Sequence, residues 1–592
     1  MKNINTSNYN FSNVISNNLI YADKTKHVWE LAKTDGAYFL SRPRRFGKSL
    51  LLSTFEELFK GSADPLQDPQ GLFKNLWISG KEPNYDFTDI YPIISLSMAM
   101  PNYSTDVLRL SIKSRLRDIA DSYDIPLNDT IPELMFKDLI LSLNRKYNKT
   151  VVLLVDEYDD PVSSVIDDPY LANKNARFLK GFYAIIKGYQ KYFRFVMLTG
   201  VTRYLLLWES GVLNHLIDLT MLEKYADICG FTYEEFDKCF ADRFQITMEQ
   251  FKEKGLLEKN CGVSDFRETI FRQYDGYSWD GKTRVLNPYS LLNAFENENL
   301  DNYWFSIEPT KKLLNAILSK EPLGLTADKL RDLSKDSIIS PSEINSMSPV
   351  PALFQTGYLT IDKITTVKKK YAAENNKLCY SFKTPNEEIK PTFLKDFSES
   401  LYQFLRIDKL NQKNNFIQAI KSENSNKLSI LIDSFFGAIP ASLHIHKEAY
   451  YHSVLYGYLE GLTDLIAFPE KPGADGTPDI LLVIGEDLYI IVELKYKDNL
   501  ELESVGDNHK IKTAMEKLAI YAIKTIDAKN YLRPYLAKAK KILKLGLGVY
   551  GRGRVVAILE NEEQAKARAK LMAKTSRSAP CNGATSKTSA KK

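Results

Sequence analysis

A membrane-spanning helix needs about 18 or more consecutive apolar residues, and this sequence of 592 residues contains no such run. The N-terminal stretch MKNINTSNYNFSN is polar and lacks the apolar core of a signal peptide. Cysteine is scarce as well: the five cysteines are scattered and form no CxxC pair. This pattern argues against a zinc ribbon and against a disulfide framework, and it is typical of a reducing compartment. We expect a cytoplasmic protein without a membrane partner.

A strong overall charge is also missing, since the formal net charge is only +5. Segment 565–592 contains eight basic and no acidic residues, so the rest of the chain has a net charge of −3. We therefore expect any nucleic-acid-binding surface of the folded part to be a local patch. The tail itself is small, polar and basic, a composition typical of a disordered, solvated end; the alternative is a tail that adds sequence-independent affinity for phosphates.

A chain of this length exceeds one ordinary core and predicts two to four domains. Its composition, with 44% hydrophobic and 26% charged residues, is that of a globular protein. In the N-terminal part, apolar strand-like runs alternate with amphipathic helical runs, and this alternation predicts an α/β domain with a parallel sheet. The expected strands are 36–42, 91–99, 150–156 and 194–199, and the expected helices are 47–59, 105–122 and 171–190.

The remainder of the sequence changes character three times. From about 225 to 310 the pattern is helical, and 320–390 combines a helix-like LTADKLRDL with a hairpin formed by YLTIDKI and LCYSFK. Helices followed by a hairpin suit a small winged-helix-like unit. Helical patterns return over 391–465, and a short α/β region at about 470–560 follows.

Residues 42–51 read RPRRFGKSLL and end like a phosphate-binding loop. The pattern G-x-x-x-x-G-K-[ST] has glycine six residues before the lysine, and this chain has Arg42 there. A helix that begins near Gly47 presents free NH groups and its positive dipole end to phosphate oxygens. Lys48 is then expected on the β- and γ-phosphates of ATP, and Ser49 on a magnesium ion. The alternative is a basic loop that only imitates a nucleotide site.

A second motif, which is acidic, favours the interpretation of the loop as a nucleotide site. VVLLVDEYDD places Asp156 and Glu157 at the carboxyl end of a buried strand, where open α/β sheets bind ligands. We expect Asp156 to hold the magnesium ion and Glu157 to polarise the attacking water; the alternative is a pair of solvated acids. On the next strand, Thr199 either senses the γ-phosphate or packs in the core. Arg203 is a candidate to reach a phosphate in its own or a neighbouring subunit; the alternative is a packing role.

The arginine-rich half of the loop fits the same interpretation. Pro43 restricts the residue before it to the extended region, where a non-glycine residue is tolerated. Arg44 and Arg45 add positive charge beside a polyanion. The expected nucleotide-binding segment of the loop consists of Arg44, Arg45, Phe46, Gly47, Lys48, Ser49 and Leu50.

Several runs together resemble the AAA-ATPase-like family of bacterial proteins: YADKT, YFLSRPRRFGKSLL, LLVDEYDDPV, LTGVTRY, GFTYEEF, YDGYSW and NPYSLL. The resemblance covers roughly 5–290, and TGYLTI and PNEEI extend it through 390. It implies a P-loop AAA-type core with a helical lid, and it implies that the first arginine is a family feature. Such proteins commonly carry a C-terminal PD-(D/E)XK nuclease-like domain. We accordingly expect an ATPase core at 1–220, a lid at 221–315 and a winged-helix-like unit at 316–395. A helical segment with a nuclease-like domain is expected at 396–560, and a basic disordered tail at 561–592.

Residues 478–497, PDILLVIGEDLYIIVELKYK, predict a β-hairpin whose short turn follows the first apolar run. If Ile484 pairs with Leu488, Asp479 lies directly opposite Glu493, and Lys495 shares the face of Glu493. Two carboxylates at this spacing repel each other unless a cation lies between them.

Magnesium with oxygen ligands suits these two carboxylates, and Lys495 would orient or deprotonate a water or stabilise charge in a phosphoryl transition state. The positions match the PD-(D/E)XK motif of the nuclease-like domains; the alternative is a hairpin with chance acids at one end. Glu448 matches the helix carboxylate of that family, shares a helix face with His452, and is expected as a further metal ligand; Glu470 is a second candidate. The chain departs from the family at 476–477 and 524–525.

Two functions follow from these patterns. The first is an ATPase coupled to a metal-dependent nuclease-like domain that acts on DNA or RNA, with ATP and Mg²⁺ as cofactors. The alternative is an ATP-dependent regulatory switch or scaffold whose nuclease-like domain binds nucleic acid without cutting it. Because AAA-type sites often lie between subunits, a homo-oligomer is also a candidate for the oligomeric state.

Overall fold

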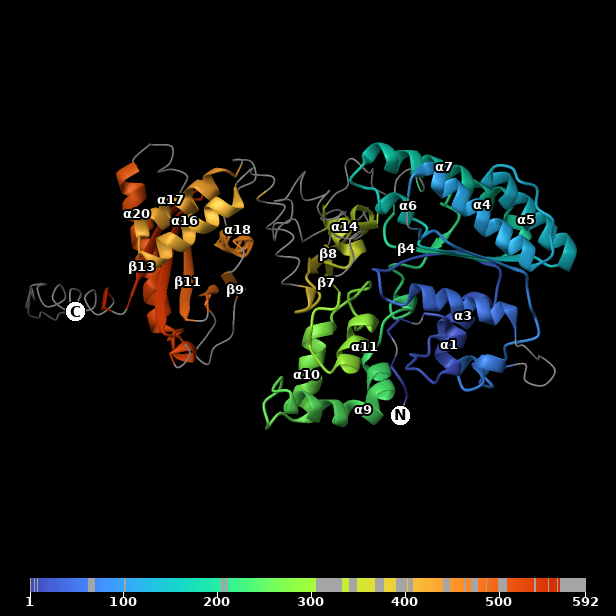
Figure 1. Cartoon of the computed structure of the whole chain (residues 1–592), viewed down its shortest axis with the longest axis horizontal. Coiled ribbons are helices and arrows are strands. Elements are labelled where there is room, and N and C mark those ends of the chain that lie inside the picture. Colours follow the sequence, from blue (N-terminus) through green and yellow to red (C-terminus); the bar gives the residue numbers. More distant parts are fainter. Residues whose placement is uncertain are drawn as a thin grey trace, which may run out of the picture. The chain divides into compact units, whose positions relative to one another are not determined.

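The computed structural model forms two compact units, Met1–Asp396 and Phe397–Lys592, and each is considered by itself (Figure 1). No helix within the described ranges is both long and apolar enough to cross a membrane. The structure describes residues 2–4, 6–7, 9–61, 70–100, 103–203, 208, 211–304, 333–339, 349–367, 377–389, 402, 408–439, 448–462, 465–469, 478–485, 487–498, 508–536, 539–551, 553–561 and 563–564.

The first unit is built on a five-stranded sheet in the order β2-β3-β4-β1-β5, and all of its strand pairs are parallel. Largely apolar runs form its central strands, as is typical of a sheet that helices cover on both faces. The parallel α/β sheet predicted from the sequence is confirmed. The strands are β1 (Gly36–Ser41), β2 (Ile93–Ser97), β3 (Val151–Asp156), β4 (Phe193–Gly200) and β5 (Ile217–Asp218).

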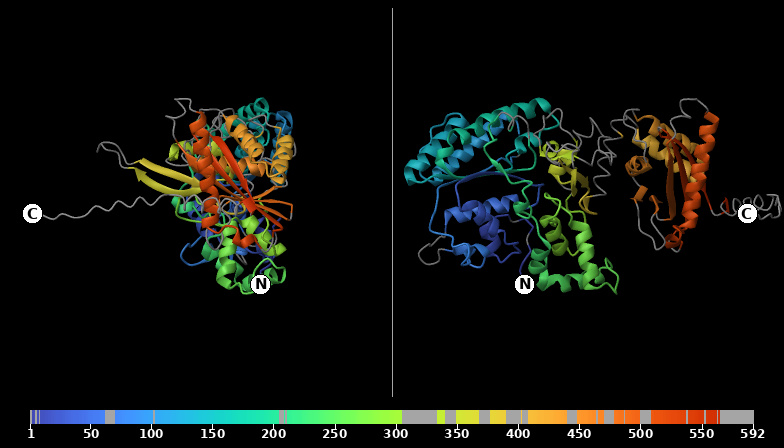
Figure 2. Two further views of the ribbon diagram at one scale, coloured as in Figure 1. Left: turned by 90° about the vertical axis from the view of Figure 1, so that its left-hand side faces the viewer. Right: turned by 180° about the vertical axis from the view of Figure 1, so that it is seen from behind.

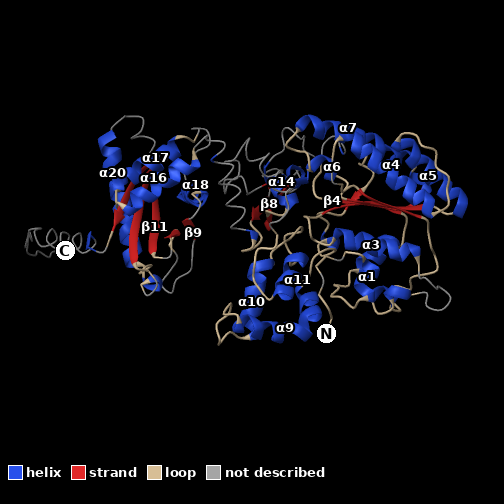
Figure 3. Ribbon diagram, viewed as in Figure 1, coloured by secondary structure: helices blue, strands red, loops and turns tan. Residues whose placement is uncertain are grey.

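Helices α4, α5 and α7 lie on one side of this sheet and α1 and α3 on the other (Figure 3). The side with α4, α5 and α7 holds the main core, in which residues such as Phe136, Leu139 and Phe182 are fully buried. The helices expected from the sequence are present, with ends shifted by at most two residues. The helices of this part are α1 (Phe11–Ser16), α2 (Thr25–Ala32), α3 (Lys48–Lys60), α4 (Thr105–Ser122), α5 (Pro132–Tyr147), α6 (Asp160–Ser163) and α7 (Pro169–Gly188).

Three helices follow, named the lid here after the sequence prediction, and their core consists mainly of aromatic rings. The capping box of Thr232 and Glu235 starts its first helix. The lid contains α9 (Tyr233–Glu253), α10 (Val263–Tyr274) and α11 (Pro288–Asn297). A three-stranded sheet in the order β6-β8-β7 comes next and includes the expected hairpin; LTADKLRDL lies almost wholly outside the described residues. Its elements are β6 (Leu333–Ser334), α13 (Lys335–Ile339), α14 (Pro349–Thr356), β7 (Thr360–Val367) and β8 (Lys377–Lys383).

The second unit contains a mixed sheet in the order β13-β12-β11-β10-β9, with a parallel pair between β11 and β12. Helix α20 packs on one face of this sheet, across β11, β12 and β13 (Figure 2). Ile484 pairs with Leu488, which confirms the predicted hairpin register. The elements are α16 (Lys409–Lys421), α17 (Ser425–Gly437), α18 (Glu448–Gly461), β9 (Leu465–Pro469), β10 (Ile480–Ile484), β11 (Leu488–Lys497), α20 (Asn508–Ala528), β12 (Lys541–Tyr550) and β13 (Arg554–Glu560).

Candidate functional site

The loop between β1 and α3 closes around the side chain of Lys48. Gly47 stands at the N-cap of α3 with a φ of 92°, a left-handed conformation that favours glycine. The buried Nζ of Lys48 donates to the carbonyl oxygens of Arg42 and Pro43 at 2.8 and 2.9 Å. Burial lowers the pKa of Lys48, and the nearby carboxylates of Asp156 and Glu157 oppose this shift. The ammonium group therefore sits within the loop, held by the loop's own backbone.

Beside this loop, one carboxylate joins two hydroxyl groups from distant parts of the chain. The Ser49 hydroxyl donates to Oδ2 of Asp156 at 2.5 Å, and the Thr199 hydroxyl donates to Oδ1 of Asp156 at 2.7 Å. Asp156 ends β3 and Thr199 lies near the end of β4, so the sheet edge brings them together. The three polar side chains selected from the sequence thus meet at one point.

Glu157 follows with a φ of 52°, which is uncommon for a residue other than glycine. Burial raises the pKa of its carboxyl group, Asp156 raises it further, and the positive charges of Arg44 and Lys48 act in the opposite direction. Nη1 of Arg44 lies 3.9 Å from Oε1 of Glu157. The carboxylate is therefore partly shielded from water and lies beside two cations of the loop.

Arg42, at the position where the common loop pattern has glycine, is fully buried. Its guanidinium donates to the carbonyl oxygens of Ser41, Thr220 and Tyr225 at 2.8–3.0 Å. It also stacks on the ring of Trp279, with its central carbon 4.0 Å from the ring centroid. Burial lowers the pKa of Arg42 to about 10. Arg42 therefore ties the loop to the segment that leads into the lid.

The next loop residues also face the lid. Arg45 stacks on the ring of Tyr289 at 3.9 Å and donates to the carbonyl oxygen of Tyr303 at 2.7 Å. Phe46 is buried against three aromatic rings, those of Tyr277, Trp279 and Trp304. Their predicted contact with a nucleotide stays a prediction, while their contacts in the structure link the loop to the lid.

A small apolar cavity of about 80 Å³ lies next to Gly47 and Leu50. Its walls come from the N-terminal segment, from α3 and from the start of the lid, with Tyr21, Leu51 and Phe231 among the lining residues. Most of the side chains that line this cavity are apolar.

Arg203 lies away from the contacts just described. Its Nη1 forms an ion pair with Oδ2 of Asp218 at 3.0 Å, and its guanidinium stacks on Trp208 at 4.1 Å. Its backbone NH donates to the side-chain oxygen of Gln355 at 3.1 Å. The proposed contact of Arg203 with a phosphate stays a prediction, and it requires the Asp218 pair to open or the phosphate to come from a neighbouring subunit.

Sequence reasoning missed Asp159, which fixes the loop after β4. Its Oδ2 accepts from the backbone NH of Thr202 at 2.7 Å and from the Thr202 hydroxyl at 2.6 Å, and its Oδ1 accepts from the NH of Val201 at 3.1 Å. A Cβ atom on Gly200 would lie 2.4 Å from Oδ1 of Asp159, so the glycine allows this close approach. The available signal was the acidic run DEYDD, whose last two acids are almost fully buried.

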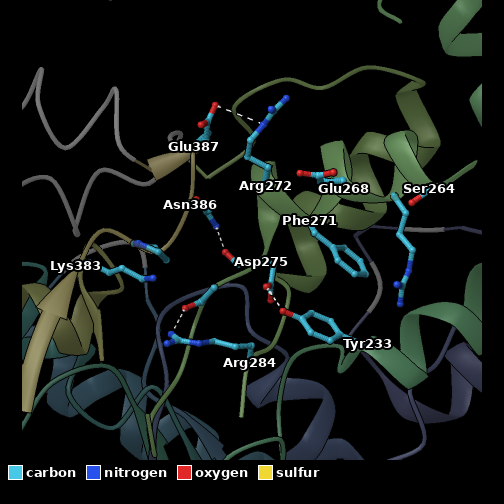
Figure 4. Close-up of a pocket in the computed structure, with 13 residues that line it drawn as sticks. Tyr233, Ser264, Glu268, Phe271, Arg272, Asp275, Arg284, Lys383, Asn386 and Glu387 are labelled. Atoms are coloured by element: carbon cyan, nitrogen blue, oxygen red, sulfur yellow. Dashed lines mark hydrogen bonds and ion pairs between the residues drawn. The ribbon is translucent and has the colours of Figure 1, made fainter. Parts of the chain in front are cut away.

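A separate cleft of about 610 Å³ opens between α10 and the segment after β8 (Figure 4). At its base the hydroxyl of Tyr233 donates to Oδ2 of Asp275 at 2.5 Å, and Asn386 donates to the carbonyl oxygen of Asp275 at 2.9 Å. Arg284 binds the carbonyl oxygens of Gly276 and Ile361, both at 2.9 Å. The bonds of Asn386 and Arg284 join the lid to the β7–β8 part of the chain, and both basic and acidic side chains line the cleft.

In the second unit, Asp479 and Glu493 face each other as the register predicts. Oδ2 of Asp479 accepts from the NH of Leu494 at 2.7 Å, and Oε2 of Glu493 accepts from the NH of Asp479 at 3.4 Å. Glu493 is only 4% exposed. Burial raises the pKa of Glu493, and repulsion from Asp479 raises it further. Two carboxylates are therefore held together at a cost that a cation between them would relieve.

Lys495 lies between the carboxylates of two different elements. Its Nζ is 3.1 Å from Oε1 of Glu493 and 3.2 Å from Oε1 of Glu448. Burial alone would lower the pKa of Lys495, but the carboxylates outweigh burial and the pKa is raised. Oε2 of Glu448 also accepts from the NH of Tyr496 at 3.0 Å, and a ring nitrogen of His452 lies 2.9 Å from the carbonyl oxygen of Asp479. Helix α18 and the hairpin thus meet at this cluster.

Asp479 and Glu493 supply the oxygen ligands that a hard cation such as magnesium prefers, but Lys495 already pairs with Glu493. Among the residues that the structure describes, no three His, Cys, Asp or Glu side chains approach closely enough to hold a metal ion. The ammonium of Lys495 stands between Glu448 and Glu493 instead. Glu470, the other candidate, lies outside the described residues, as do residues 476–477.

The parallel sheet, the loop that ends in Lys48 and Ser49, and the strand-end Asp156 are consistent with a P-loop ATPase domain. Residues 6–206 match the family model of AAA-ATPase-like proteins, which is described as a predicted AAA-ATPase. A protein of Azotobacter chroococcum mcd 1, described as an uncharacterized protein in the vnfD 5′ region, is 26% identical over 541 residues, which cover 89% of this chain and 92% of that protein. No solved structure matches the chain significantly.

Proposed function

We propose that the first unit binds ATP with Mg²⁺ and hydrolyses it. The observation that carries this proposal is the pair of hydrogen bonds that Asp156 accepts from Ser49 and Thr199, directly beside the Lys48 loop. The match to a predicted AAA-ATPase family supports the same function. Ser49 and Asp156 would hold the magnesium ion, which neutralises phosphate charge when bound.

The chain's own groups have distinct proposed roles. Lys48 exchanges the carbonyl oxygens of Arg42 and Pro43 for phosphate oxygens, which are stronger acceptors for an ammonium group. Glu157 orients and polarises the attacking water, because its carboxylate lies beside the loop and is partly shielded from solvent. Thr199 orients the carboxylate of Asp156 and contacts the γ-phosphate.

We further propose that the second unit contains a nuclease-like site that acts on DNA or RNA. Its supporting observation is the opposition of Asp479 and Glu493 with Lys495 beside them. Asp479, Glu493 and Glu448 would hold a divalent cation, which activates water and polarises a phosphodiester when bound. Lys495 would then be free to stabilise developing negative charge.

A second candidate function is a nucleotide-dependent switch or scaffold whose second unit binds nucleic acid without cleaving it. The observation that favours it is the ion pairing of Lys495 with both Glu493 and Glu448, which places a cation of the protein where a metal ion would be needed. Both proposals include the division into an ATPase core, a lid, a winged-helix-like unit, a nuclease-like domain and a basic tail. Both also include assembly of the chain into a homo-oligomer.

The deciding experiment is a nucleotide-dependent cleavage assay of the full chain on single- and double-stranded DNA and RNA with Mg²⁺ or Mn²⁺. The nuclease function predicts cleavage by the wild type and none by Asp479→Ala. If the two proteins bind nucleic acid equally and neither cleaves it, the scaffold function is supported. ATP turnover that is abolished in Lys48→Ala supports the ATPase function, and absence of nucleotide binding by the wild type contradicts it.

A further inference from the structure

Asp160, which begins the short helix α6, is a buried carboxylate with donors from three segments of the chain. It is only 3% exposed. It accepts from Nη2 of Arg44 in the phosphate-type loop, from the hydroxyl of Tyr103 in the β2–α4 connection, and from the hydroxyl of Ser164 at 3.1 Å. Because a buried charge needs such donors, Asp160 would keep two of them if Arg44 moved away.

Arg44 lies between two carboxylates and next to the loop lysine. Besides the bond to Asp160, its Nη1 is 3.9 Å from Oε1 of Glu157. Its charge also acts on Lys48, where like-charge repulsion contributes to the lowered pKa of Lys48. The guanidinium therefore binds Asp160 and lies near Glu157, in the same loop as the ammonium group that would contact the terminal phosphates.

The other two loop arginines are arranged differently. Arg42 and Arg45 donate to backbone carbonyl oxygens and stack on Trp279 and Tyr289 of the lid. A planar guanidinium that binds carboxylates can exchange them readily for phosphate oxygens, because it presents the same paired donors to both. Of the three arginines, Arg44 is thus the one whose surroundings resemble those of a phosphate contact.

We propose that Arg44 recognises the γ-phosphate of ATP and that Asp160 holds it in place when this phosphate is missing. The exchange moves Arg44 away from Glu157 only when a triphosphate is bound, so the group that polarises water is released from the guanidinium together with the arrival of its substrate. ADP has no γ-phosphate, and with ADP Arg44 stays on Asp160. This inference rests on the proposed ATP site and adds a positioning role for Asp160.

The test compares the affinities of the full chain for ADP and for a non-hydrolysable ATP analogue, both with Mg²⁺. Arg44→Gln is expected to weaken binding of the analogue about tenfold, because a charge-assisted contact to phosphate is lost, and to leave ADP binding nearly unchanged. Asp160→Asn is expected to strengthen binding of the analogue and to leave ADP binding nearly unchanged, since Arg44 is then no longer held by a full negative charge. Opposite shifts of the analogue-to-ADP ratio would support the exchange.

Arg45→Gln provides the matched comparison, because it removes the same charge from the same loop without facing Asp160. Its effect on the two nucleotides is expected to be equal. If Arg44→Gln also weakens binding of both nucleotides equally, Arg44 is a structural residue and the proposal is overturned. This outcome does not depend on whether Asp160→Asn folds. If the wild type binds neither nucleotide, the proposed ATP site fails first and this inference with it.

Discussion

The hydroxyl of Ser49 donates a hydrogen bond to the carboxylate of Asp156 at 2.5 Å, across a sequence separation of 107 residues. Ser49 lies in the first turn of α3, and Asp156 ends the strand β3. Neither position requires the other for local structure, so their contact at the sheet edge is a property of the site.

Glu157→Gln is expected to retain ATP binding and to lower ATP turnover about 10²- to 10⁴-fold, the usual contribution of a positioned base. The amide keeps the size of the side chain but cannot polarise water. Turnover and nucleotide binding are measured separately on the full chain. Glu234→Gln, an exposed glutamate of α9, is the control and is expected to behave like the wild type. Unchanged turnover in Glu157→Gln would favour a structural role for the nucleotide.

Gly200→Ala is expected to reduce turnover through Thr199 and Asp156. An added Cβ would lie 2.4 Å from Oδ1 of Asp159, so the loop after β4 must shift and the Thr199 hydroxyl loses its position. Because a shift of this loop also strains the core, we expect a lower melting temperature too. Gly188→Ala, where a Cβ meets nothing within 4 Å, is the matched control. Equal turnover of the two variants would contradict the positioning role of the loop.

Much of the first unit could be predicted because its strands are long apolar runs at regular intervals. β3 and β4 are buried on both faces, and their sequences alone indicate a parallel sheet. The hairpin register in the second unit was predictable for a related reason, since the short turn fixes which residues pair.

The roles of Arg42, Asp159 and Asp160 could not be predicted in the same way. Whether a charged side chain is buried depends on segments far away in the sequence, such as the carbonyl oxygens of Thr220 and Tyr225 that bind Arg42. The arginines of the loop look alike in sequence, yet Arg44 faces carboxylates and Arg42 stacks on a lid tryptophan. Only the tertiary structure separates these environments.

Arg42→Ala is expected to destabilise the first unit by about 3 kcal/mol, because it leaves buried carbonyl oxygens without a donor. Arg42→Lys retains the charge but not the planar set of donors that reaches Thr220 and Tyr225, so it should recover only part of the stability. Urea-induced unfolding measures both. Arg117→Ala removes an exposed arginine of α4 and is expected to change the free energy of unfolding by less than about 0.5 kcal/mol. Equal effects of Arg42→Ala and Arg117→Ala would contradict the role assigned to Arg42.

Glu388 predicts a pH dependence of stability. Burial raises its pKa to about 7, although its Oε1 accepts from the NH groups of Tyr303 and Trp304 and Arg45 lies near enough to lower the pKa. A carboxyl group whose pKa is raised on folding binds its proton more tightly in the folded state. Its stabilising contribution is therefore complete below about pH 4.5 and is lost as the pH rises through about 7.

Glu388→Gln isolates this contribution, because glutamine imitates the protonated group at every pH. Between pH 5 and 8 the free energy of unfolding of the wild type should fall relative to that of Glu388→Gln by up to about 3 kcal/mol. Urea titrations of both proteins at several pH values measure the difference. A constant difference across this range would show that Glu388 does not titrate there.

The cluster of Glu448, Asp479, Glu493 and Lys495 in the second unit is expected to respond to divalent cations. Lys495→Met removes the cation that lies between Glu448 and Glu493, so their carboxylates repel each other more strongly and attract a divalent cation more strongly. We expect Mn²⁺ to raise the melting temperature of Lys495→Met more than that of the wild type, while cleavage of nucleic acid is lost because Lys495 no longer stabilises charge. Asp479→Ala should lose both the shift and cleavage. The control is Lys540→Met, whose ion pair with Asp487 is exposed and lies at the turn end of the hairpin. Equal Mn²⁺ shifts in the two lysine variants would mean that the carboxylates of this cluster do not bind the ion.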